Sequence, residues 1–206
     1  SPQDHARVTA AIKAAEQKTN GEIYCVMAHA SDGYFFPAAL VSIVGILLAS
    51  LALSFWLEAS WLSVRLPWFA AAQLLAAAAV LLLLWAAPRL RIHLVPHHLR
   101  FQAAHANAGK QFLAHNVHLT AARTGVLIFV SLAERYAEIV ADSGIDSHVE
   151  QHVWDKIVQD LTASAGDGRL VDGFVRAIEM AGVVLAEHFP VSPGDADELD
   201  NQLVEI

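Results

Sequence analysis

The stretch FPAALVSIVGILLASLALSFWL, residues 36–57, contains no charged side chain, and neither does PWFAAAQLLAAAAVLLLLWAA, residues 67–87. Each is close to the roughly 20 apolar residues that a helix needs to cross the hydrocarbon core of a bilayer. A buried core helix is the alternative interpretation, but such helices normally carry a polar stripe, which both stretches lack. Tryptophans near the ends of the stretches suit the two membrane interfaces. The pair therefore predicts a transmembrane helical hairpin.

Positive charge is placed unevenly around this hairpin. Arg89, Arg91 and Arg100 follow the second stretch closely, whereas the loop between the stretches holds only Arg65. Because cytoplasmic flanks carry an excess of arginine and lysine, the loop is predicted to lie outside and the flanks inside. We therefore expect an integral protein of the bacterial cytoplasmic (inner) membrane, with two spans and with both termini and the soluble domain in the cytoplasm.

The composition of the chain limits what the part outside the hairpin can be and what it can bind. The chain has 206 residues, enough for one soluble domain of ordinary size plus a membrane element. Its net charge of −8 argues against nucleic acid as a partner, since affinity for nucleic acid rests on basic surface. Cys25 is the single cysteine, so the sequence predicts no disulfide framework and no Cys-x-x-Cys site. The simplest interpretation of Cys25 is a small buried strand residue.

Helices and strands alternate on either side of the hairpin. The apolar strand 125–132 is predicted to be central in its sheet, and its short connection to the next strand predicts an antiparallel pair. The isolated first strand should pair with these two, because a lone short strand leaves its backbone groups unpaired. A Ser-x-x-Glu capping box at 147–150 is expected to open a helix. Strands are predicted at 22–29, 125–132 and 134–141, and helices at 3–19, 97–119, 147–163 and 170–188.

These elements predict the fold class and four parts of the chain. The class is α/β (α+β): a small mixed sheet flanked by helices, with an inserted transmembrane helical hairpin. Residues 1–32 are the first part of the domain, residues 33–90 are the hairpin, and residues 91–190 are the second part. Residues 191–206 are acidic and contain proline and glycine, so they are expected to be a flexible tail.

The stretch TGVLIFVSLAERYAEIVADSGI, residues 124–145, combines a glycine-led apolar strand, a charged turn and a second strand that ends near a glycine. Two helices with a glycine-rich break continue the pattern through residue 188, and GEIYCVMA at 21–28 supplies a first strand. This order resembles the TPM-domain family, in particular membrane-anchored bacterial members with an inserted hairpin. Familiar members often have Gly-Leu-Glu after the third strand, where this chain has Ser143-Gly144-Ile145-Asp146.

The resemblance implies an acidic metal site, because some members have been assigned divalent-metal binding or weak phosphatase activity. Calcium or magnesium would take oxygen ligands that converge from several loops. The alternative is that each acid has an ordinary role in a turn or in the first turn of a helix. No other cofactor is expected. The candidate ligands are Asp142, Asp146, Asp167 and Asp172.

Eleven histidines also invite a metal interpretation. His148 and His152 are four residues apart, so on one helix they could chelate a zinc or copper ion. The alternative is that the histidines are ordinary polar side chains at a surface or an interface. Neither apolar stretch contains a histidine, which excludes a haem ligated by histidine within the bilayer.

Two functions remain open. The first is a non-catalytic, membrane-anchored interaction or assembly module, such as an accessory subunit, that contacts membrane lipid and binds another integral membrane protein or complex. The alternative is a divalent-metal-dependent phosphatase of the TPM type held at the membrane. We favour the first, because no residue pair at a recognisable spacing supplies a nucleophile and its base. The apolar stretches contain no ionisable group, which argues against a transporter.

Overall fold

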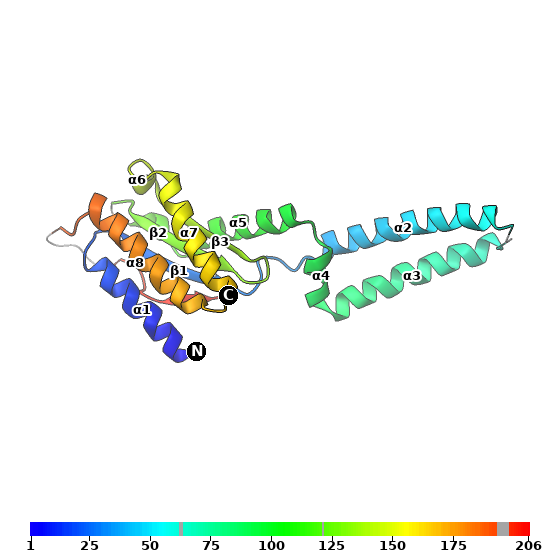
Figure 1. Ribbon diagram of the computed structural model, residues 1–206, viewed down its shortest axis with the longest axis horizontal. Helices are drawn as coiled ribbons and strands as arrows, with labels where there is room; N and C mark the ends of the chain where they lie inside the picture. The colour runs from blue at the N-terminus through cyan, green and yellow to red at the C-terminus, as the bar shows by residue number, and fades with distance from the viewer. Residues whose placement is uncertain (62–63, 121, 193–197) are drawn as a thin grey trace. The chain divides into compact units, whose positions relative to one another are not determined.

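The computed structural model describes residues 1–61, 64–120, 122–192 and 198–206. Parts of the predicted loop (62–63) and of the predicted tail (193–197) therefore lie outside the described residues. The chain forms two compact units (Figure 1). The sheet unit joins Ser1–Ser31 to Phe101–Ile206, and the hairpin unit is Asp32–Arg100. The sheet unit is thus built from two segments that the hairpin unit separates in sequence.

The sheet unit contains a mixed sheet with the strand order β3-β2-β1-β4. Strand β1 (Glu22–Ala28) runs parallel to β2 (Gly125–Ser131), and β3 (Tyr136–Ala141) is antiparallel to β2. The prediction that the first strand shares one sheet with the two later strands is confirmed: β1 pairs with β2, and β2 pairs with β3. All residues of β2 are buried, as expected for a central strand covered on both faces.

The fourth strand was not predicted. Strand β4 (Leu203–Glu205) pairs in parallel with β1, which corrects the expectation of a flexible tail for these residues. The pairing continues at Ile206, whose N–H donates to the Met27 carbonyl at 3.0 Å and whose carbonyl accepts from the His29 N–H at 2.8 Å. Strand β1 is already held in place by β2, so its edge is a template for β4. Without this partner, the short acidic segment would not form a strand.

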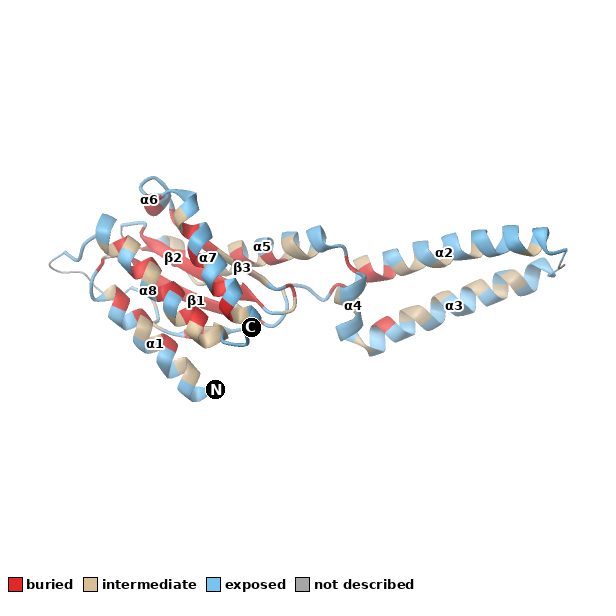
Figure 2. Cartoon of the chain, in the orientation of Figure 1, coloured by how far each residue is buried: buried red, intermediate tan, exposed pale blue. Residues whose placement is uncertain are grey.

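Helices cover both faces of the sheet. On one face, α1 (Pro2–Glu16), α7 (Gln151–Gly166) and α8 (Leu170–His188) share a buried cluster with the strands. On the other face, α5 (His97–Ala114) and the 3₁₀ turn η1 (Val117–Leu119) cover Tyr24, Leu127 and Phe129. The buried residues follow the strands and the inner faces of these helices (Figure 2). The predicted fold class, a small mixed sheet flanked by helices, is confirmed.

The start of the helix after β3 differs from the prediction. A short helix, α6 (Ser143–Asp146), comes first, and α7 begins at Gln151 rather than at residue 147. Asp142 caps α6, because its Oδ1 accepts a hydrogen bond from the Ser143 N–H at 2.7 Å. Residues 147–150 lie between the two helices, so the Ser-x-x-Glu pattern does not act as a capping box.

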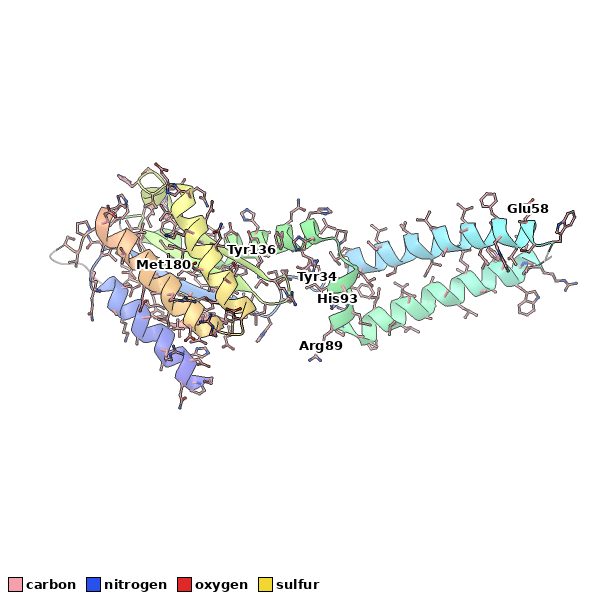
Figure 3. All side chains as sticks on the ribbon, in the orientation of Figure 1. Tyr34, Glu58, Arg89, His93, Tyr136 and Met180 are labelled. Atoms are coloured by element: carbon pink, nitrogen blue, oxygen red, sulfur yellow. The ribbon has the colours of Figure 1, made fainter. Side chains whose placement is uncertain are left out.

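The hairpin unit contains α2 (Phe35–Ala59), α3 (Leu66–Ala86) and the short α4 (Pro88–Leu94). Helices α2 and α3 are each long and apolar enough to cross a membrane, and they cover the two predicted spans. Gln73 of α3 donates a hydrogen bond to the Ser50 hydroxyl of α2 at 3.2 Å. Glu58 lies at the loop end of this hairpin, while Arg89 lies at the other end, in α4 (Figure 3).

Candidate functional site

A buried polar network lies where the parallel strands β1 and β2 end. Glu134, in the turn between β2 and β3, is 2% exposed, and its Oε1 accepts a hydrogen bond from the Ser31 N–H at 3.0 Å. Ser131 donates its hydroxyl proton to Oε2 of the same carboxylate, and the Ser31 hydroxyl donates to Ser131 Oγ at 2.9 Å. Both carboxylate oxygens are therefore bonded, as a buried acid requires. The network fixes the shape of the β2–β3 turn.

A pocket of about 340 Å³ adjoins this turn. It lies between the turn, the first residues of β3 and the C-terminal part of α7. The volume is at the lower end of the roughly 300–1,000 Å³ typical of small-ligand sites. Its walls combine aliphatic side chains with a few polar groups: Val130, Ser131, Leu132, Arg135, Tyr136, Ala137, Leu161, Thr162, Ala165 and Gly166.

Arg135 is the charged residue of this pocket. It adopts φ = 53°, a left-handed conformation that costs a residue with a Cβ about 1–2 kcal/mol. Its N–H donates to the Leu132 carbonyl at 3.2 Å and closes the turn. Among the residues that the structure describes, no carboxylate lies within ion-pair distance of the exposed guanidinium. The pocket therefore offers an unpaired cation, which favours a ligand with negative charge.

Tyr136 forms part of the pocket wall and starts the edge strand β3 (Figure 3). Its hydroxyl donates to Glu138 Oε2 at 2.9 Å. Burial, and to a lesser extent the charge of Glu138, raises the pKa of the Tyr136 phenol well above its ordinary value. The phenol therefore stays neutral at ordinary pH.

Strand β3 is one edge of the sheet, and its outer side presents backbone groups. Asp142 N–H donates to the Gly125 carbonyl at 2.9 Å, which sets the alternation of bonded and non-bonded pairs in the antiparallel β2–β3 ladder. In this register the N–H and C=O groups of Ala137, Ile139 and Ala141 point away from β2. An edge of this kind is a template for another strand.

Asp142, the first predicted metal ligand, is buried and serves the fold. In addition to capping α6, its carboxylate lies 3.6 Å from the Arg123 guanidinium. Asp146 is exposed in α6, one turn further on. Asp142 and Asp146 are close in the chain. However, Asp142 already caps a helix, which is the kind of structural role that we gave as the alternative to metal binding.

Asp167 and Asp172 lie elsewhere. Asp167 pairs with Arg169 at 2.9 Å, and Asp172 pairs with Arg7 of α1 at 2.6 Å. Helix α7 separates Asp146 from Asp167, and a helix of 16 residues is about 24 Å long. Within the described part of the chain, no group of three or more His, Cys, Asp or Glu side chains is arranged to hold a metal. The four acids do not fit a joint calcium or magnesium site.

The two candidate histidines are not on one helix. His148 precedes α7, and its Nδ1 lies 3.0 Å from the Gly144 carbonyl oxygen. His152 lies in α7, and its Nδ1 is 3.0 Å from a carboxylate oxygen of Glu150. The expected spacing of one helical turn is therefore lost, because the helix starts after His148.

Cys25 is fully buried in β1, in agreement with the structural interpretation of this residue. Burial raises the pKa of the Cys25 thiol well above its ordinary value, so the thiolate is disfavoured. The sequence did not single out Ser131, Glu134 or Arg135. The one available signal was a charged pair, Glu134-Arg135, directly after an apolar strand, and such a pair is also usual in a turn.

Comparison with known proteins supports the fold. A family model described as the TPM domain matches residues 88–184. The NMR structure of the BA42 protein from the psychrophilic bacterium Bizionia argentinensis is similar, with a TM-score of 0.61 and 20% sequence identity. The match covers 100% of this chain and 94% of that one, and at this identity it shows the fold alone. No curated protein matches the chain. The predicted resemblance to the TPM-domain family is confirmed.

Proposed function

This chain carries a TPM domain, and on that premise we propose that it is a membrane-anchored interaction module that binds another integral membrane protein without catalysing a reaction. The observation that carries the proposal is the edge strand β3, whose outward backbone groups at Ala137, Ile139 and Ala141 suit the addition of a partner strand. The family is linked to phosphatase-like function in some members, so turnover is the competing function.

The arrangement of the acids favours binding over turnover. Hydrolysis of a phosphate ester needs an activated nucleophile or a metal-bound water. Asp167 and Asp172 are paired with arginines, and Asp142 caps a helix. The buried Glu134 has both carboxylate oxygens in hydrogen bonds to serines that hold the turn. Each of these groups has a structural role, and together they form no acid–base pair.

The membrane hairpin supports the same proposal. Two helices long enough to cross a bilayer would keep the sheet unit within reach of membrane-bound targets, so modest affinity would suffice. We place the sheet unit in the cytoplasm, because Arg89 and Arg91 follow α3 while the loop end of the hairpin carries Glu58 and Arg65.

A proline scan of the two sheet edges tests the binding function. The Ala141→Pro substitution removes an outward N–H from β3, a position where an edge strand tolerates proline. The matched control is Glu205→Pro on β4, at the opposite edge. We expect Ala141→Pro to abolish recovery of the partner from membranes in mild detergent, with the partner identified by mass spectrometry and confirmed by reciprocal capture. Glu205→Pro should leave that recovery intact, and both variants should keep the circular-dichroism spectrum of the parent.

A combined variant separates binding from turnover. It carries Asp142→Asn, which keeps a good helix cap, with Asp146→Ala, Asp167→Ala and Asp172→Ala. Partner recovery should be unaffected by these four changes. If this variant loses function in cells while Ala141→Pro retains it, the interaction module is the wrong conclusion, and magnesium- or calcium-stimulated phosphatase activity of the parent chain becomes the measurement to make.

A further inference from the structure

The pocket and the edge strand are continuous. Tyr136 and Ala137 line the pocket, and they are also the first two residues of β3. The outward backbone groups of β3 begin at Ala137, so a strand added to this edge would end or begin beside the pocket. Arg135 immediately precedes β3 and supplies the charge at this end.

The other polar groups around the pocket are already used. The carbonyls of Ala163 and Ala165, at the end of α7, accept hydrogen bonds from the Asp167 and Gly168 N–H groups at 3.1 Å. The neighbouring Ser164 carbonyl accepts from the Arg169 N–H at 2.9 Å. The negative end of α7 is therefore satisfied within its own turn. The guanidinium of Arg135 remains as the group with spare hydrogen-bond donors at the pocket.

The conformation of Arg135 adds a second observation. Glycine would adopt φ = 53° without strain, yet the chain has an arginine here. A residue kept in a strained backbone conformation beside a pocket is a common property of ligand sites. A bidentate carboxylate is the ligand that a guanidinium binds best. The aliphatic walls contributed by Val130, Leu161 and Ala165 favour an apolar group next to that carboxylate.

We propose that this pocket binds the C-terminus of a partner protein. The last side chain of the partner, an apolar one, enters the pocket, its terminal carboxylate pairs with Arg135, and the preceding residues pair with β3. Since Arg135 lies at the beginning of β3, the partner strand runs antiparallel to β3. This assignment rests on the proposed binding function and deepens it by naming what the edge recognises.

The test uses the full chain in lipid nanodiscs and a library of random heptapeptides that end in a free carboxylate. Peptides selected from the library should end in an apolar residue. Amidation of the peptide C-terminus should weaken binding by roughly 10- to 100-fold, the usual effect of losing a charge-assisted hydrogen bond. Fluorescence anisotropy on the labelled peptide measures this ratio.

Three variants locate the effect. Arg135→Gln should weaken binding of the free peptide as much as amidation does, and it should remove the difference between the two peptides. Arg135→Gly should do the same while relieving the backbone strain, so its loss of binding is not a loss of folding. Ala165→Leu should weaken binding of both peptides by filling the pocket. The matched control is Arg169→Gln, an exposed arginine just beyond α7, which should bind like the parent.

Other results would overturn the inference. Equal affinity for the free and amidated peptides, or a library that yields no binder, excludes recognition of a C-terminus. If hexanoate binds as tightly as the peptides, the pocket is a site for small carboxylates and the strand pairing is wrong. If Ala141→Pro abolishes capture of the membrane partner but Arg135→Gln does not, the edge binds its partner without the pocket, and the proposed function stands while this inference fails.

Discussion

The two units of this chain use the same apolar amino acids in opposite ways. In the sheet unit, Phe129 and Ile128 of β2 are completely buried, and helices cover both faces of the strand. In the hairpin unit, Phe55 is 65% exposed and Leu48 is 62% exposed. An apolar sequence thus predicts that its side chains leave water. It does not predict whether they pack against protein or against lipid.

Periodicity distinguishes the two environments. The buried residues of α8 follow a stripe at helical spacing, at Phe174, Ala177, Ile178, Ala181 and Leu185. Along α3, Leu84 is the buried residue, and apart from Gln73 the rest of the helix is apolar on all sides. A helix packed on a sheet needs one apolar face, whereas a helix in lipid needs apolar groups all round.

Thiol labelling tests most directly whether the hairpin unit and the sheet unit lie in different environments. On a Cys25→Ala background, Ser60→Cys should react with a membrane-impermeant maleimide added to spheroplasts, and Lys18→Cys should not. Ser60 lies at the loop end of the hairpin unit and Lys18 lies in the sheet unit, and both positions are exposed in the structure. Both should therefore react after detergent is added. Labelling of Lys18→Cys alone in intact spheroplasts would show the reverse orientation.

A matched pair of phenylalanine substitutions measures what burial contributes in each unit. Phe129→Ala should lower the free energy of unfolding of the sheet unit by about 3–5 kcal/mol, because it leaves a cavity in a closed core. Phe55→Ala should leave that free energy unchanged. Urea titration in detergent, followed by pulsed labelling of the buried Cys25 thiol, reports on the sheet unit alone. A similar loss in both variants would mean that the two units unfold together.

The smallest expected effect concerns helix ends. Helix α6 is capped by Asp142, whereas α2 and α3 have no side-chain cap. Asp142→Ala should destabilise the sheet unit by about 1 kcal/mol through loss of the cap. The neighbouring exposed acid provides the control, since Asp146→Ala should change stability by less than about 0.5 kcal/mol. The same urea titration distinguishes these two values. Equal losses of stability in the two variants would mean that loss of the cap does not account for the effect of Asp142→Ala.

Much of the fold was predictable because its strongest signals are local. The apolar runs gave the hairpin helices, and the apolar strand 125–132 together with its short turn gave the antiparallel pair. Strand β4 escaped prediction because Leu203 and Val204 are two apolar residues in an acidic segment. Its strand conformation depends on pairing with β1, which lies almost 180 residues away in the chain. A single sequence contains no record of that contact.

The candidate site was harder to predict for the same reason. Ser31 and Ser131 are separated by 100 residues, and only the parallel register of β1 and β2 brings their hydroxyls to 2.9 Å. Before that register is known, Glu134 and Arg135 read as an ordinary charged turn. The acids that the sequence suggested followed from the family resemblance, and the two histidines were selected by spacing. Spacing failed for His148 and His152 because α7 starts at Gln151.

The buried network at the end of β1 has a mechanical consequence. Ser31 is the last residue of the first segment of the sheet unit, and the next residue belongs to the hairpin unit. Tension on this connection, directed along β1, would load the parallel β1–β2 pair in shear, so that its seven residue pairs resist together instead of unzipping one by one. The hydrogen bonds from Ser31 to Glu134 and Ser131 take the load first. A pull on the hairpin unit would thus reach the β2–β3 turn as a pull on the carboxylate that holds it.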